Sequence, residues 1–235
     1  MEQIYSFPVI GMVHSCFKEK FGIPRQPGLA TAATATLEVV APYNNPDAFQ
    51  GLELTSHIWL QFVFHQNNTE QWRPKVRPPR LGGNKSIGVF ATRSPVRPSP
   101  IGLSVVKLER LELGPSLVRL HLSGIDLLDG TPVLDIKPYV PYVDALSEAT
   151  NQFAEREPVL LPVIFSDKLQ LELAPRRDLL LLIEQVLQQD PRPKYHALDE
   201  QRRYGMRIED VEVRWYYQLL EGELCVRVDT IERVV

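Results

Sequence analysis

Eight cations lie in one stretch of the sequence that contains no acidic residue. Between Gln71 and Leu108 the positive side chains are Arg73, Lys75, Arg77, Arg80, Lys85, Arg93, Arg97 and Lys107. The chain as a whole has a net charge of −3, so the remainder, without these eight charges, carries −11. Positive potential concentrated on one surface of an acidic protein favours a polyanionic partner.

Prolines restrict the shape of this basic stretch. Six of them fix φ and remove backbone donors, so the cations cannot lie on a helix: Pro74, Pro78, Pro79, Pro95, Pro98 and Pro100. We predict stiff, extended loops around one short strand, Ile87 to Ala91. A charge run is often only solvated surface. The prolines, and the many Arg side chains whose planar fork matches carboxylate and phosphate, favour a binding surface instead.

Two smaller groups of residues could also do chemistry. His65 and Gln66 end a β-prone segment, where they are either an aromatic and an amide at the mouth of a pocket or an ordinary hydrogen-bonded strand end. Asp126 and Asp129 bracket a turn that continues into Gly130. Asp-Gly is a common turn signal, so these carboxylates alone do not establish a site.

Several familiar sites are absent from the sequence. It contains no HExxH, no GxSxG and no GxGxxG between a strand and a helix, which argues against metalloproteases, serine hydrolases and Rossmann nucleotide sites. Gly83-Asn84-Lys85 lacks the glycine that a P-loop places directly before its lysine. Cys16 and Cys225 lie far apart without a CxxC pair, so we expect neither a disulfide nor a metal site.

The beginning of the chain resembles neither a signal peptide nor a membrane anchor. Glu2 stands where a secretory signal carries cations, and the sequence has no run of eighteen apolar residues. We therefore expect a cytoplasmic protein that does not span a membrane.

The first 140 residues are rich in strand patterns. Ser56 to His65 alternates so that Ile58, Leu60, Phe62 and Phe64 share one face, which predicts a central strand. Leu103 to Leu113 and Leu117 to Ser123 flank Gly114-Pro115 and predict a hairpin. Ile4 to His14, Thr34 to Val40 and Val133 to Ile136 complete six or seven strands, which is typical of a barrel or a sandwich.

A second pattern follows the polar segment from Tyr142 to Pro158, which we interpret as a linker. Val159 to Phe165 predicts a strand, and Val211 to Leu219 and Leu224 to Ile231 predict two more. Between them, one helical face contains Leu179, Leu182, Ile183, Val186 and Leu187. We therefore predict a mainly β protein with two domains, a β-barrel at residues 1–145 and a small α+β domain at residues 146–235.

The sequence closely resembles, over nearly its whole length, the longer bacterial form of the TrmO family of tRNA N6-methyltransferases. The resemblance rests on several motifs: Pro24-Arg25-Gln26-Pro27-Gly28, Phe64-His65-Gln66, Val89-Phe90-Ala91-Thr92-Arg93-Ser94, Asp129-Gly130-Thr131-Pro132, Asp135-Ile136-Lys137-Pro138-Tyr139 and Gln189-Asp190-Pro191-Arg192-Pro193. One departure is Ser99, where the family motif has Asn.

The resemblance implies a β-barrel methyltransferase that binds S-adenosylmethionine, acts as a homodimer and methylates N6 of threonylcarbamoylated adenosine beside the anticodon of tRNA. The implied cofactor-binding residues are Pro24, Arg25, Gln26, His65, Gln66, Arg93, Leu103, Asp126, Leu127, Leu128 and Asp129. We expect tRNA to be bound by Arg73, Lys75, Arg77, Arg80 and Arg97. No catalytic base is assigned. Two rival functions stay open, a cofactor-binding sensor without catalysis and a β-barrel RNA-binding module without cofactor.

Overall fold

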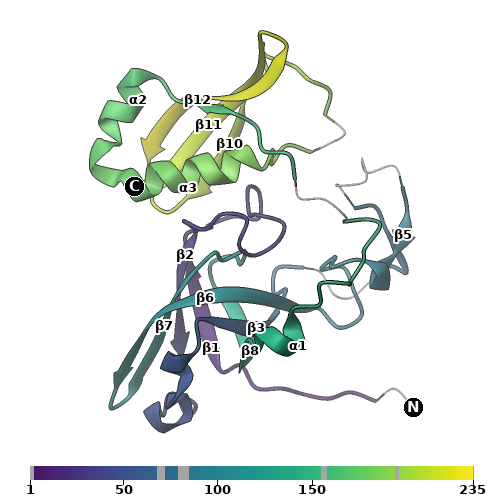
Figure 1. Cartoon of the computed structure of the whole chain (residues 1–235), viewed down its shortest axis with the longest axis vertical. Helices are drawn as coiled ribbons and strands as arrows, with labels where there is room; N and C mark the ends of the chain where they lie inside the picture. The colour runs from purple at the N-terminus through teal and green to yellow at the C-terminus, as the bar shows by residue number, and fades with distance from the viewer. Residues whose placement is uncertain (1–2, 68–71, 79–84, 155–157, 194–195, 235) are drawn as a thin grey trace.

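The larger part of the protein is a closed six-stranded barrel. The computed structural model describes residues 3–67, 72–78, 85–154, 158–193 and 196–234. The strands follow the order β1-β2-β7-β6-β3-β8 around the barrel (Figure 1). Their bounds are Gly11–Ser15 (β1), Thr34–Val39 (β2), His57–Val63 (β3), Ile101–Gly114 (β6), Leu117–Ser123 (β7) and Thr131–Pro138 (β8). The structure thus selects the barrel over the sandwich.

The predicted central strand is confirmed as β3. It pairs antiparallel with β6 on one side and β8 on the other. Ile58, Leu60 and Phe62 are almost fully buried in the barrel, while His57, Trp59 and Gln61 point to its outer surface. This alternation follows from the two-residue repeat of a strand and places large polar and aromatic side chains outside the barrel. The hairpin predicted around Gly114-Pro115 is confirmed as β6 and β7.

Two predicted strands are wrong in extent. Of Ile4 to His14, only Gly11 to His14 belongs to a strand, although the Ile10 N–H still donates to the Val133 carbonyl. Of Val159 to Phe165, only Val163–Ile164 (β9) is a strand, and the Leu161 N–H donates to the end of a helix instead. Val159 itself is exposed.

The strand predicted at Ile87 to Ala91 is also wrong. Only Ile87–Gly88 (β5) is extended, and it pairs with Lys75–Val76 (β4) in a separate two-stranded sheet outside the barrel. Val89–Ala91 forms a 3-10 turn (η4). The Thr92 hydroxyl and N–H both donate to the Val89 carbonyl, and these bonds close the turn.

The second part of the chain is a small α+β unit. Its sheet has the order β10-β11-β12-β9, with β10 at Tyr204–Ile208, β11 at Val211–Leu220 and β12 at Glu223–Arg233. The predicted helix is α3, Arg177–Gln188, and its buried residues are the five predicted ones. The sequence patterns missed β10, the short helices α1 (Pro141–Asp144) and α2 (Asp167–Glu172), and 3-10 turns at Leu52–Leu54 (η2) and Ala174–Arg176 (η5). A further 3-10 turn, η1, lies at Pro46–Phe49.

The loop between β1 and β2, residues 16–33, lies between the barrel and the second unit (Figure 1). At its start, the Glu209 N–H donates to the Cys16 carbonyl at 2.7 Å. The Phe21 ring stacks on Trp215 with centroids 5.8 Å apart. At its end, the Ala32 N–H donates to Gln185 Oε1 on α3 at 2.8 Å. The second unit therefore holds this loop at several points along its length.

Cys16 and Cys225 are both buried and free, which confirms the prediction of no disulfide. Within the described ranges, no helix is long and apolar enough to cross a membrane.

Candidate functional site

A cavity of about 410 Å³ lies on the outer surface of the barrel. Its floor comes from outward residues of two paired strands, His57 and Trp59 on β3 and Leu103 and Val105 on β6. Loop and helix residues complete its walls: Pro27, Arg93, Tyr139 and Asp144. The cavity has the size of a small-molecule site. It contains Arg93 and Leu103, both of which the resemblance assigns to the cofactor.

Two side-chain hydrogen bonds lie near this cavity, and the charge of Arg93 acts on the half-buried Asp126. Arg93 Nη1 donates to Gln26 Oε1 at 2.5 Å. Asp126 Oδ1 accepts a hydrogen bond from the buried Ser104 hydroxyl at 2.7 Å. Burial raises the pKa of Asp126 to about 6, although the Ser104 hydrogen bond and the positive charge of Arg93 both act against the rise. Four segments distant in sequence therefore meet here.

Two glycines allow the 16–33 loop to approach Asp126. The Gly28 N–H donates to the Gly124 carbonyl at 2.8 Å. Gly124 has a φ of +69°, and a Cβ there would lie 3.4 Å from the Gly28 Cα. The close backbone approach and the left-handed conformation both favour glycine at position 124. This contact places Gln26 beside the segment that contains Asp126.

Asp129 has different partners from Asp126. Its Oδ1 accepts the Ser15 N–H at 2.8 Å, and its Oδ2 lies 3.0 Å from Lys18 Nζ. Its own N–H donates to the Phe17 carbonyl at 2.9 Å. These bonds tie the turn before β8 to the end of β1. Asp129 therefore has a structural role in this arrangement.

The remaining residues assigned to the cofactor differ in their exposure to solvent. Pro24, Leu127 and Leu128 are buried, so their side chains expose little surface. Arg25, His65 and Gln66 are exposed and do not line the cavity. Lys20 Nζ donates to the Gln66 carbonyl at 2.5 Å, so this strand end also contacts the 16–33 loop.

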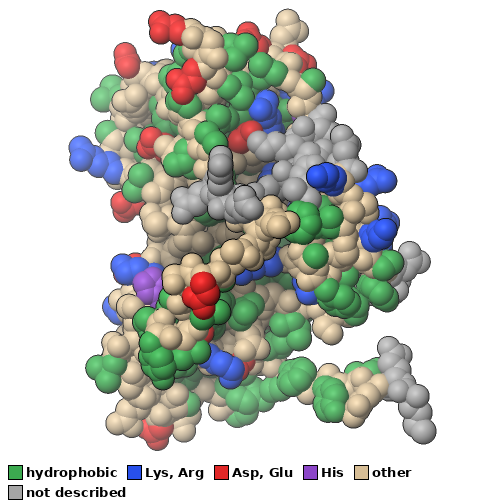
Figure 2. Space-filling model, turned by 45° about the vertical axis from the view of Figure 1, so that its right-hand side comes forward, with side chains coloured by type: hydrophobic (Ala, Val, Ile, Leu, Met, Phe, Trp, Pro, Cys, Tyr) green, Lys and Arg blue, Asp and Glu red, His purple; other side chains and the backbone are tan. Residues whose placement is uncertain are grey.

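The basic stretch forms a projection beside the barrel. Arg73, Lys75 and Arg77 are exposed on and around β4, and Figure 2 shows Lys and Arg side chains gathered at the right of the molecule. Arg97 differs, because its Nη1 donates to the carbonyls of Thr92 and Ser94, at 3.1 and 3.4 Å, and so supports its own loop. Arg80 lies outside the described residues.

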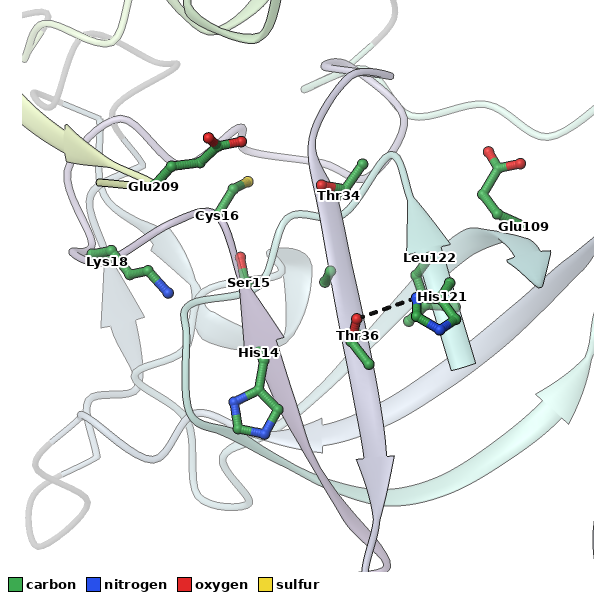
Figure 3. Close-up of a pocket in the computed structure, with 11 residues that line it drawn as sticks. His14, Ser15, Cys16, Lys18, Thr34, Thr36, Glu109, His121, Leu122 and Glu209 are labelled. Atoms are coloured by element: carbon green, nitrogen blue, oxygen red, sulfur yellow. Dashed lines mark hydrogen bonds between the residues drawn. The ribbon is translucent and has the colours of Figure 1, made fainter. Parts of the chain in front are cut away.

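A second cavity, of about 480 Å³, lies over β1, β2 and β7 (Figure 3). His14, Thr36 and His121 line it along the strands, with Thr36 Oγ1 3.5 Å from His121 Nδ1, and Glu209 approaches from the second unit. Burial raises the pKa of the Cys16 thiol in its wall to about 12, which disfavours the reactive thiolate form. Among the predicted cofactor and tRNA residues that the structure describes, none lines this cavity. We therefore assign function to the smaller cavity.

The sequence patterns missed the aromatic side of the smaller cavity. His57, Trp59 and Tyr139 line it together. Trp59 Nε1 donates to Asp144 Oδ2 at 3.0 Å, and the same oxygen accepts the Val140 N–H at 2.8 Å. These two bonds lower the pKa of Asp144, the Val140 N–H having the larger effect. The sequence signal that could have revealed this side of the cavity is the presence of large aromatic side chains on the outward face of a strand.

Comparison with known proteins gives consistent matches along the chain. Residues 12–145 match the family model of the tRNA-methyltransferase O N-terminal domain, and residues 158–234 match that of the TrmO C-terminal domain. The Escherichia coli protein named tRNA (adenine(37)-N6)-methyltransferase is 46% identical over 217 residues, which cover 90% of this chain and 92% of that protein.

A Pseudomonas aeruginosa protein, RcsF, is 53% identical over 218 residues, which cover 91% of this chain and 93% of that protein. Its name assigns it provisionally to the S-adenosylmethionine-dependent methyltransferases. A crystal structure of TrmO from Pseudomonas aeruginosa is 43% identical, covers 98% of this chain and 99% of that chain, and superposes with a TM-score of 0.80.

Proposed function

This chain belongs to the tRNA-methyltransferase O family, and we propose that it methylates N6 of threonylcarbamoylated adenosine beside the anticodon of tRNA, with S-adenosylmethionine as methyl donor. Its E. coli relative is named for methylation of N6 of adenine 37 in tRNA, which supports the acceptor. That the acceptor adenosine carries a threonylcarbamoyl group is inferred from the family resemblance.

The observation that carries this proposal is the meeting of opposite charges beside one apolar cavity. S-adenosylmethionine has a carboxylate, an ammonium group and an adenine. Arg93, held by Gln26, can pair with a carboxylate, and the half-buried Asp126 can accept a hydrogen bond from an ammonium group. Leu103 and Pro27 give the cavity an apolar wall. The residues present therefore fit this cofactor.

Bound S-adenosylmethionine supplies a methyl group on a positively charged sulfur, which needs no further activation as a leaving group. The protein's main contribution is then to hold donor and acceptor in line. Gln26 and Ser104 support this by fixing Arg93 and Asp126 through hydrogen bonds. The threonine carboxylate of the acceptor calls for a further Arg, and Arg77 is exposed and available for it.

The test is a transfer assay with nucleoside analysis. The protein is incubated with methyl-labelled S-adenosylmethionine and tRNA that lacks the methyl group, and the tRNA is then digested to nucleosides. We expect label in N6-methylated threonylcarbamoyladenosine. Arg93→Ala should lose most of the signal, whereas Lys168→Ala, on the exposed face of α2, should keep it. Cofactor binding without transfer would favour the sensor, and tRNA binding without cofactor binding would favour the RNA-binding module.

We also propose that residues 1–145 form the cofactor-binding domain, that residues 146–235 support it, and that two copies associate in the cytoplasm. Ile4, Tyr5 and Phe7 are 79%, 69% and 64% exposed, which supports burial of this segment in an assembly. Sedimentation should then give twice the chain mass of 26.8 kDa. A sedimenting species of one chain mass at micromolar concentration would contradict the dimer.

A further inference from the structure

We propose that His57, Trp59 and Tyr139 form a stacking site for an unpaired base of the RNA substrate. The proposal rests on the proposed function and names the part of the cavity that the RNA occupies. It assigns the aromatic side of the cavity to the RNA and leaves the Arg93 side to the cofactor.

The three rings form one cluster on the outer surface of the barrel. The Trp59 and Tyr139 centroids lie 6.0 Å apart with the planes at 41°, and the His57 and Tyr139 centroids lie 6.4 Å apart with an edge contact. All three side chains are half-buried, so each ring keeps some surface exposed. Unpaired bases of RNA loops commonly stack on such exposed aromatic side chains.

Asp144 orients the indole for stacking. It accepts the indole N–H at 3.0 Å, so the only polar atom of Trp59 is satisfied at the ring edge. The Val140 N–H holds the same carboxylate oxygen at 2.8 Å. The orientation of the ring is therefore set by two hydrogen bonds before any ligand arrives, which lowers the entropic cost of stacking.

Cations flank the aromatic cluster on both sides. Directly across from Trp59 on β8 is Lys137, and directly across from His57 on β6 is Lys107. Residues opposite each other in antiparallel strands have Cβ atoms roughly 5 Å apart. Each lysine forms an ion pair with an exposed acid, Lys137 with Asp135 at 2.7 Å and Lys107 with Glu109 at 2.9 Å. Exposed pairs of this kind contribute little free energy, so a phosphate can replace the acid.

This arrangement favours a nucleotide of the RNA over the adenine of the cofactor. Within an RNA strand, each nucleotide is flanked by a phosphate on either side, whereas S-adenosylmethionine has no phosphate. Aromatic rings between two lysines match a base and its adjoining phosphates. The single carboxylate of S-adenosylmethionine is assigned to Arg93, so the cofactor leaves Lys137 and Lys107 without an anionic partner.

Tryptophan emission gives a direct test. The chain has three tryptophans, of which Trp215 is fully buried and Trp72 is exposed. The protein is titrated with an anticodon stem-loop RNA in the absence of cofactor. We expect quenching that is lost in Trp59→Phe and kept in Trp72→Phe. Quenching that Trp59→Phe leaves unchanged would overturn the proposal.

Binding constants give a second test. Tyr139→Ala should weaken stem-loop binding about tenfold, the scale of one stacked base, while Tyr139→Phe should bind nearly as the parent does. Both variants should bind S-adenosylmethionine within about twofold of the parent, as measured by calorimetry, which also shows that they are folded. Lys137→Ala should keep the quenching and reduce the salt dependence of RNA binding by one phosphate's share, about 0.7 in the log–log slope.

The outcomes separate this inference from the proposed function. If Tyr139→Ala loses cofactor binding and keeps RNA binding, the rings hold the cofactor's adenine and the inference is wrong. Unchanged binding of both ligands would also overturn it. If the parent shows Trp59-dependent quenching but transfers no methyl group, the stacking site stands and the proposed activity is wrong.

Discussion

At the scale of single residues, Asp126 and Asp129 show how two acids on one turn acquire different roles. Asp129 accepts a hydrogen bond from the Ser15 N–H and forms an ion pair with Lys18, and all three residues belong to the barrel domain. Asp126 is half-buried, accepts a hydrogen bond from the Ser104 hydroxyl and lies near the charge of Arg93. The turn itself is ordinary, so the difference comes from what the neighbouring segments place against each carboxylate.

We expect Asp126→Asn to weaken S-adenosylmethionine binding about tenfold or more, the scale of one charge-assisted hydrogen bond. Asp129→Asn should leave cofactor binding almost unchanged and lower the free energy of unfolding by about 1 kcal/mol, because its bonds link β1 to β8. Calorimetry and urea unfolding of both variants measure the two effects. Equal, small losses of affinity in both would mean that neither acid holds the ammonium.

The raised pKa of Asp126 predicts a pH dependence of stability. The ordinary value of 3.8 applies to the unfolded chain, and burial raises the folded value to about 6. The stabilising contribution of this group is therefore fully present below pH 3.8 and is lost as the pH rises through 6. Relative to Asp126→Asn, the parent should lose at most roughly 3 kcal/mol across that window.

Urea unfolding of the parent and of Asp126→Asn, at intervals from pH 4.5 to pH 8, measures this loss. The difference between the two proteins should change most between pH 4.5 and pH 6.5 and then level off. A difference that stays constant over the whole range would show that Asp126 titrates alike in the folded and unfolded chains.

At the scale of secondary-structure elements, α3 contacts the 16–33 loop, which contains residues that we propose bind the cofactor. Gln185 Oε1 accepts the Ala32 N–H at 2.8 Å, and Gln189 Nε2 donates to the Leu29 carbonyl at 3.3 Å. The same loop contains Pro24, Arg25 and Gln26. A helix of the second unit therefore positions residues that the barrel domain presents to the ligand.

Gln185→Ala should raise the dissociation constant for S-adenosylmethionine severalfold, because a lost hydrogen bond of about 1 kcal/mol frees the end of the loop. Gln188→Ala is the matched control, since its side-chain amide donates to Glu184 on the same helix. It should bind cofactor like the parent. The measurement is calorimetry after a thermal check of folding. Equal affinities in both variants would show that α3 does not position the loop.

At the scale of the whole molecule, charge is separated between an acidic body and the basic projection. The exposed cations of the projection are Arg73, Lys75, Arg77 and Lys85. If these four meet phosphates of a single-stranded loop, log K for tRNA should fall with log salt at a slope of roughly −3. A mobility assay over a range of salt concentrations measures this slope, and a value near zero would remove the projection from the RNA site.

Two variants test which residues of the basic stretch bind RNA and which bind the cofactor. Lys75→Ala should flatten the salt dependence by about 0.7 and leave cofactor binding unchanged. Arg93→Ala should weaken cofactor binding about tenfold with little change in tRNA affinity measured without cofactor. The opposite pattern would show that Arg93 serves the RNA and Lys75 the cofactor.

The sequence by itself determined the structural elements that depend on short-range residue patterns. Alternation in Ser56 to His65 predicted the buried face of β3, because a strand between two neighbours must bury every second side chain. The 3.6-residue repeat predicted the buried face of α3, and Gly114-Pro115 predicted the β6–β7 hairpin. The sequence motifs identified the resemblance to the family, and that resemblance implied most of the proposed cofactor-binding residues.

Only the tertiary structure decided which residues meet. Closure of the barrel brought His57, Lys107, Trp59 and Lys137 into adjacent pairs, and no periodicity in one strand contains the register of its neighbours. Packing of the 16–33 loop against Gly124 brought Gln26 towards Arg93 and Asp126. Burial and charge at a site depend on contacts between distant segments, so the raised pKa of Asp126 and the aromatic side of the cavity emerged from the fold.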